Sequence, residues 1–252
     1  VVYFSDLLDG NKWSGGSSGS LNISGSFAKN SDVITGLAAH NGFLIIFCRN
    51  QIMIYKDSDA FVGSFDTASL SLVETLDGVG CLSHHTIQNV GNDVLFLSAT
   101  GIRSLGRTIQ EKSQPIGNIS KNIRDDLMEL VDNETTLTDI KAIYCPAFAF
   151  YLVLFPSAKV TYCFDTRAPL EDGAYRVTQW SNSTNTNFLY DSQERKLLYT
   201  ETNGLAEYFG YQDNTEGFTY SYLSNYFDLG AVNNIKMVKR MSTTVIAPDN
   251  RV

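Results

Sequence analysis

The chain has 252 residues, of which 43% are hydrophobic and 18% are charged. This is the composition of a globular protein, and it excludes a disordered or collagen-like chain. The 19 Lys and Arg against 27 Asp and Glu give a formal net charge of −8. Because nucleic-acid phosphates are themselves negative, this charge argues against a conventional DNA-binding protein.

Aromatic side chains make up 12% of the chain, with 13 Tyr and 15 Phe, and there are 19 Gly. Aromatic residues are enriched in strands and Gly is frequent in turns, so we expect a mainly β protein. Apolar stretches such as residues 43–48 are far shorter than the roughly 18–20 residues that cross a bilayer. The sequence therefore predicts no membrane-spanning helix.

Both ends of the sequence indicate a piece of a longer polypeptide. Residues 1–6 have no initiator Met, no basic region and no apolar core, which argues against a signal peptide. The other end stops just after a strand-like stretch, residues 243–247. We therefore expect further sequence on both sides.

A phrase of strand, turn, strand, turn and strand recurs along the chain with a period of about fifty residues. Its four copies start near residues 34, 86, 140 and 187. In the first copy Asn41-Gly42 separates two apolar runs, which is a strong hairpin signal. The predicted strands are residues 34–39, 43–48, 51–55, 86–90, 94–98, 102–105, 140–145, 148–155, 159–165, 187–190, 196–200 and 205–209.

This repeat is typical of the blades of a β-propeller. We predict a mainly β fold, a propeller of about four or five blades with flanking β-strands and one short helix. A sandwich of hairpins is the competing architecture, although it does not require the repeat. The predicted organisation is flanking strands and a Gly/Ser loop over residues 1–29, propeller-like repeats over 30–217, and a flanking β-element over 218–252 that continues into missing sequence.

The one predicted helix lies between the second and third copies. Asn118 or Ser120 is its candidate cap. Its apolar residues recur with the period of a helix, at Ile119, Ile123, Leu127, Leu130 and Val131.

The carboxylates give no sign of a catalytic pair. They fall mostly at turns or strand ends, where Asp bonds to nearby backbone groups. The Ser-x-Asp-x-Gly-x-Thr-Trp boxes of sialidase-type propellers do not occur, and the Gly/Ser run at residues 15–19 lacks the flanking strand and helix of a phosphate-binding loop. We therefore expect no enzyme and no catalytic or cofactor site. The carboxylates considered are Asp6, Asp9, Asp93, Asp139, Asp165 and Asp191.

Cys81, His84 and His85 form a C-x-x-H-H cluster whose ligand types suit zinc. A structural zinc site needs a fourth ligand, and His40 is the only other His. We therefore favour neutral His residues at a turn and predict no metal site.

The four cysteines lie beside apolar or aromatic neighbours and form no C-x-x-C pair, which indicates buried thiols. In a hairpin that turns near Ser157, Cys163 is expected opposite about Tyr151. Cys145 and Cys163 should then not pair.

Two other clusters have alternative interpretations. Lys236, Lys239 and Arg240 lie on a predicted strand, where we favour a solvated or interface surface over a nucleic-acid contact. Trp13 and Trp180 could stack sugars in a carbohydrate-binding or carbohydrate-active propeller, but we favour packing between blades. A cellular propeller scaffold that binds peptides is a third class, although its Trp-Asp and Gly-His signatures are missing.

Several phrases resemble the tail nozzle or hub proteins of short-tailed bacteriophages, also called tail tubular protein B or DNA-stabilisation proteins. The likeness covers nearly the whole chain, but its motifs are apolar and turn patterns without catalytic residues. The phrases are residues 2–9, 34–47, 80–87, 93–105, 175–180, 225–230 and 236–240.

The resemblance implies a structural virion protein of the phage tail that is assembled in the host cytoplasm. Such a subunit forms a ring, a hexamer in the family, below the portal and adaptor, and genomic DNA is retained and ejected through it without sequence-specific binding. The resemblance implies no cofactor, no metal and no catalytic residue. Pro146 and Pro156 replace the usual Gly-type turns, which predicts a distorted third blade.

Overall fold

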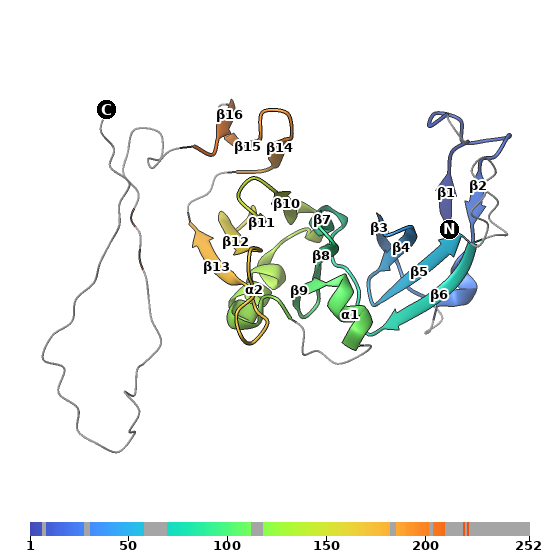
Figure 1. Cartoon of the computed structure of the whole chain (residues 1–252), viewed down its shortest axis with the longest axis horizontal. Helices are drawn as coiled ribbons and strands as arrows, with labels where there is room; N and C mark the ends of the chain where they lie inside the picture. Colours follow the sequence, from blue (N-terminus) through green and yellow to red (C-terminus); the bar gives the residue numbers. More distant parts are fainter. Residues whose placement is uncertain are drawn as a thin grey trace, which may run out of the picture. The chain divides into compact units, whose positions relative to one another are not determined.

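The computed structural model describes residues 1–6, 9–27, 31–57, 70–111, 118–181, 185–201, 204–209, 219 and 221. The chain divides into two units, Val1–Tyr208 and Phe209–Val252, and every helix and strand named below belongs to the first. That unit contains five antiparallel sheets of two to four strands, which confirms the mainly β fold (Figure 1). Within the described residues the sheets do not close into a barrel or a propeller.

Each sheet is a run of strands that follow one another in the sequence and pair in that order. The β1–β2 sheet and the β3–β6 sheet contain β1 (Val2–Phe4), β2 (Gly19–Leu21), β3 (Ile34–His40), β4 (Phe43–Cys48), β5 (Gln51–Asp57) and β6 (Leu70–Asp77). The β7–β9 sheet contains β7 (Gln88–Val90), β8 (Asp93–Ser98) and β9 (Gly101–Ser104).

The last two sheets repeat this plan. The β10–β13 sheet contains β10 (Lys141–Cys145), β11 (Phe150–Phe155), β12 (Val160–Asp165) and β13 (Arg176–Trp180). The β14–β16 sheet contains β14 (Phe188–Asp191), β15 (Lys196–Glu201) and β16 (Gly204–Glu207). The first strands β3, β7, β10 and β14 begin within two residues of the predicted repeat starts.

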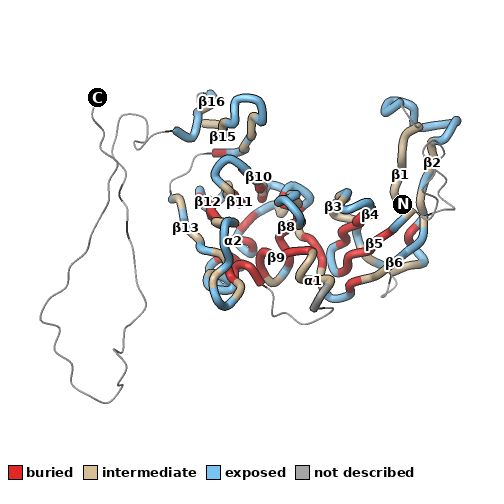
Figure 2. The backbone as a smooth tube through the Cα atoms, viewed as in Figure 1, coloured by how far each residue is buried: buried red, intermediate tan, exposed pale blue. Residues whose placement is uncertain are grey.

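The β3–β6 sheet is covered on both faces because its apolar side chains alternate. Ile45 and Phe47 lie on one face and pack with Phe96 of β8, whose ring centroid is 5.0 Å from that of Phe47. Ile46 and Met53 lie on the other face, and the residues packed there come from the β1–β2 sheet and its surroundings: Val2, Leu21, Ile23 and Phe27. The buried residues of β4 and β5 are drawn red in Figure 2.

The same alternation joins the later sheets in series. Leu95 and Leu97 of β8 point to the face opposite Phe96 and pack with Tyr151 and Val153 of β11. Leu152 lies on the opposite face of β11 and packs with residues of the β14–β16 sheet, namely Phe188, Tyr190 and Leu197. Each sheet therefore packs against the sheets that precede and follow it in the sequence.

The described residues form two α-helices, so the predicted helix is present and a second helix was not predicted. The predicted helix is α2 (Arg124–Asn133), preceded by η5 (Lys121–Ile123). The additional helix is α1 (Leu105–Glu111), which begins where the last strand of the second copy was expected to end. The remaining short helices are η1 (Ser24–Ser26), η3 (His84–Thr86) and η6 (Leu137–Asp139).

Contacts from a distant strand explain the start of α1. Asp93 of β8 accepts hydrogen bonds from the Gly106 N–H at 2.9 Å and from the Ser104 hydroxyl. These bonds supply the acceptor that a helix N-terminus needs. A local cap adds to this contact, because the hydroxyl of Ser104, directly before the helix, accepts the Arg107 N–H at 3.1 Å.

Candidate functional site

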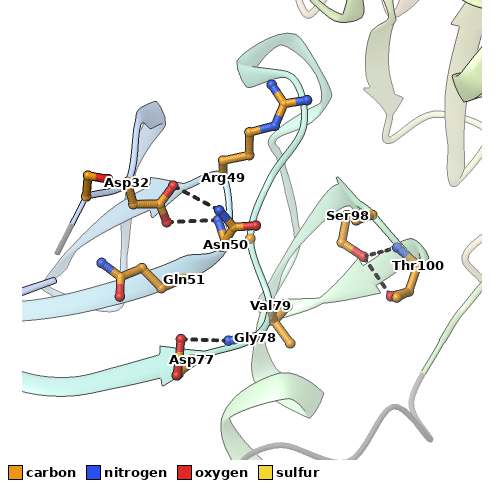
Figure 3. A pocket seen from close by; sticks show the side chains of 12 residues that line it. Asp32, Arg49, Asn50, Gln51, Asp77, Gly78, Val79, Ser98 and Thr100 are labelled. Atoms are coloured by element: carbon orange, nitrogen blue, oxygen red, sulfur yellow. Dashed lines mark hydrogen bonds between the residues drawn. The ribbon is translucent and has the colours of Figure 1, made fainter. Parts of the chain in front are cut away.

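A polar pocket lies where turns of the β3–β6 and β7–β9 sheets meet. Its volume is about 440 Å³. Figure 3 shows side chains of the β4–β5 turn, the end of β6 and the β8–β9 turn around it, among them Arg49, Gln51, Asp77, Ser98 and Thr100.

The polar groups of this pocket hold turns in place. Asp32 accepts the Asn50 N–H at 2.9 Å and the Asn50 side-chain amide at 3.3 Å. Asp77 accepts the Gly78 N–H at 3.0 Å, and the Ser98 hydroxyl accepts the Thr100 N–H at 3.2 Å (Figure 3). The pocket lining, as far as the structure describes it, includes no His, Cys or Lys.

Three of the carboxylates considered above bind backbone at turns or at a helix start. Asp191 accepts the Gln193 N–H at 2.8 Å, and Asp9 accepts the Asn11 N–H at 3.1 Å. Asp93 holds the start of α1 as described above. These bonds agree with the local role predicted for Asp at turns.

Two further carboxylates form ion pairs at the surface. Asp6 pairs with Lys12 at 2.5 Å and accepts the Ser17 N–H at 2.8 Å, so it orders the Gly/Ser loop. Arg167 donates bidentate hydrogen bonds to the Asp165 carboxylate, with nitrogen–oxygen distances of 2.5 and 2.8 Å. The hydrogen bonds from Arg167 lower the pKa of the Asp165 carboxyl.

The C-x-x-H-H motif does not converge on one point. Cys81 is fully buried and its thiol donates to the Ser83 carbonyl at 3.1 Å. Burial raises the pKa of the Cys81 thiol to about 11, so it is protonated at neutral pH. His84 and His85 are exposed instead, and no group of three metal-ligating side chains is found in the described part of the chain.

All four cysteines are buried free thiols. Cys163 pairs in register with Leu152, one residue from the expected Tyr151, and Cys145 and Cys163 are not joined, as predicted. Burial raises the pKa of the Cys163 thiol to about 12. The thiols are therefore part of the apolar core.

An aromatic cluster joins the last two sheets. The Trp180 ring stacks on Tyr208, with centroids 5.3 Å apart and planes 6° apart. Phe148 contacts Tyr208 edge-on at 5.5 Å. Trp180 thus packs between sheets, whereas Trp13 in the N-terminal loop is 60% exposed.

Sequence reasoning did not single out the exposed side of α2. Four carboxylates lie there, on Asp125, Asp126, Glu129 and Asp132. Their spacing follows the helical period opposite buried Leu127 and is the signal that could have identified them. The predicted basic cluster Lys236, Lys239 and Arg240 lies outside the described residues.

Comparison with known proteins adds no relative. No protein-family model matches the sequence, and no curated protein matches it. Among the described helices, none is long and apolar enough to cross a membrane.

Proposed function

We propose that this chain is part of a structural virion protein, a subunit of the tail nozzle or hub ring of a short-tailed bacteriophage. Genomic DNA is retained and ejected through that ring. The proposal starts from the resemblance of the apolar and turn phrases, such as residues 34–47 and 93–105. The observation that carries it is the series of antiparallel sheets, each packed on the next.

In this proposal the sheets are consecutive blades of a β-propeller. The first strands support this arrangement, because β10 contacts both β7 and β14. First strands that neighbour one another are what blades around a common axis require. The β3–β6 and β10–β13 sheets also have the four strands of a propeller blade.

Charge supports a passage for DNA. The net charge is −8. The exposed side of α2 adds a row of carboxylates that includes Asp125 and Glu129. An acidic lining repels phosphates, so DNA slides without being held. The ring, its portal and adaptor partners and its hexameric symmetry come from the family resemblance.

A structural role also agrees with how the carboxylates are used. Asp32, Asp93 and Asp191 accept hydrogen bonds from backbone N–H groups at turns and at a helix start. A catalytic acid or base must instead lie within hydrogen-bond reach of a substrate. We therefore propose a scaffold rather than an enzyme.

A carbohydrate-directed propeller is the alternative. A sugar needs an accessible aromatic face. Trp180 stacks one face on Tyr208, whereas Trp13 and Tyr3 near the N-terminus are largely exposed. Glycan-array binding or release of reducing sugar would favour this alternative.

The direct test is mass spectrometry of tryptic peptides from density-purified virus particles of the source. We expect peptides of this chain, and of its extensions, in a fixed small number of copies per particle. Absence from the particles together with recovery in the soluble or secreted fraction would contradict the virion role.

The charge mechanism has its own test with a matched control. Asp125→Lys with Glu129→Lys reverses two charges on α2, and Glu171→Lys with Glu207→Lys reverses two exposed charges elsewhere. We expect slower DNA ejection from particles with the α2 pair, because cations bind phosphates. Equal ejection rates for both variants would show that α2 does not face the DNA.

A further inference from the structure

A short segment, residues 80–88, connects three sheets. The Cys81 N–H donates to the Cys48 carbonyl of β4 at 2.9 Å, and the Leu82 N–H donates to the Leu97 carbonyl of β8 at 2.9 Å. A Cβ on Gly80 would overlap the carbonyl oxygens of Arg49 and Cys48, so this close approach requires glycine.

Side chains of the same segment extend the connection to the β10–β13 sheet. The Ser83 hydroxyl donates to the Ile140 carbonyl at 3.0 Å. The Gln88 amide donates to the Ala142 carbonyl at 3.0 Å, and the Tyr151 hydroxyl donates to the Thr86 carbonyl at 2.7 Å. We call residues 80–88 the junction, because its hydrogen bonds hold all three sheets.

Two histidines occupy the exposed side of the junction, on η3. The rings of His84 and His85 have centroids 3.7 Å apart and planes 38° apart. Next to them is Gly36 of β3, where an added Cβ would lie 3.1 Å from the Cβ of His84. The pair therefore sits beside the buried residues Ser83 and Thr86 that make the bonds to the next sheet.

The surroundings of His85 disfavour its protonation. Partial burial has the largest effect in lowering the pKa of His85, followed by His84 and by Lys141 of β10, while Asp139 of η6 opposes them. Of the other elements packed on η3, β3 has only His40 and β8 has only Asp93 as titratable residues. His40 bonds the Asn92 carbonyl and Asp93 bonds the start of α1.

We propose that His84 and His85 make the junction acid-sensitive. When the pair takes up protons, two like charges are brought to ring-contact distance beside Lys141. Separating them displaces η3 and weakens the bonds of Ser83 and Thr86 to Ile140 and Tyr151. The joint between the β7–β9 and β10–β13 sheets then loosens.

The direction of the pKa shift decides whether the junction is more stable at high or at low pH. The pKa of His85 is lowered from its ordinary 6.5, so the folded junction favours the neutral ring. Its contribution to stability is complete above the ordinary pKa and is lost as the pH falls through the lowered one. This inference does not depend on the proposed phage function.

Hydrogen exchange of the full chain tests the proposal at about pH 7.5 and about pH 5.5, after correction for intrinsic exchange. Residues 82–98 and 140–153 should exchange severalfold faster at the lower pH, and the β14–β16 sheet should not. His84→Gln with His85→Gln should abolish this difference. His40→Gln, the control, should keep it.

An equal acid response in the double variant would overturn the proposal, as would an equal increase in all sheets. The single variant His85→Gln guards against misfolding of the double variant, because it keeps His84 and removes only the charge pair. This variant should retain less than about half of the acid-induced increase in hydrogen exchange, because one of the two coupled histidines is gone. A full response in that variant would also overturn the proposal.

Discussion

The β3–β6 and β10–β13 sheets have the same four-stranded plan but differ in where they are irregular. The register shifts between Ile34 and Gly36 and again between Ile54 and Tyr55. The β10–β13 sheet pairs without a shift along all its strands. Its prolines Pro146 and Pro156 were predicted to distort it, and that prediction was wrong.

The position of the prolines in the turns explains why they do not disturb the pairing of the strands. Each proline opens a four-residue turn that ends on a residue with positive φ, 55° at Ala149 and 54° at Lys159. Each proline directly follows the last paired residue of its strand, so its missing N–H removes no hydrogen bond of the ladder, and its carbonyl accepts the N–H that closes the turn. By contrast, Asn41 (φ 50°) and Gly42 (φ 77°) form a tight two-residue turn.

One of the two irregularities of the β3–β6 sheet, between Ile34 and Gly36, lies where the sheet meets the junction. At Gly36 an added Cβ would overlap the side chain of Ile87. The bulge next to it lets β3 approach the junction closely. At this end of β3, therefore, contact between sheets rather than turn composition accounts for the local distortion.

The largest expected effect is at the point where the β3–β6 sheet joins the junction. Gly80→Ala should destabilise the protein by about 3 kcal/mol, because the backbone must move to relieve the overlap and loses the Cys81–Cys48 bond. Chemical denaturation measures the change. Gly25→Ala, where nothing lies within 4 Å, is the control and should change stability little.

The second largest loss of stability is expected when Glu134, which holds the turn that starts at Pro156, is changed. Glu134 is 8% exposed and accepts the Ser157 N–H at 3.0 Å and the Ser157 hydroxyl at 2.6 Å. Glu134→Ala removes both hydrogen bonds, and because Ser157 is exposed its donors can bond to water instead, so the change should cost about 1 kcal/mol. Glu134→Gln keeps one oxygen and should cost less. Equal losses in thermal unfolding would contradict this account.

The third effect is a gain in stability. Ala149→Gly should stabilise the β10–β11 turn by about 0.5–1 kcal/mol, because its φ of 55° is strained for a residue with a Cβ. Ala147→Gly in the same turn should not stabilise, since Ala147 does not have a positive φ. A rise in the melting temperature of the second variant alone would refute the strain argument.

The smallest effect is at the end of β12. Arg167→Ala removes the hydrogen bonds that lower the pKa of Asp165, so that pKa should rise toward its ordinary value. Because the pKa of Asp165 is lowered from its ordinary value of 3.8, the ion pair stabilises the fold above pH 3.8. This stabilisation is lost as the pH falls through the lowered pKa. NMR titration of the Asp165 carboxyl checks the shift. An unchanged titration would show that the ion pair does not form in solution.

Much of the strand pattern could be predicted because buried strands carry long apolar runs. The sequence predicted β4 with the bounds that the structure has, and β8 within one residue. The fourth strands β6 and β13 were not predicted as members of their sheets. β13 has no buried residue, and β6 has only Leu76, so neither shows a clear apolar signal.

The sequence by itself determined the mainly β class, the repeat and its turns, since alternation and turn residues are local properties. Only the tertiary structure decided the use of Asp93 and Glu134 and the junction around Thr86. Each of these depends on hydrogen bonds between groups 11 to 65 residues apart. Such partners meet only after the sheets have packed, so no local pattern could have revealed them.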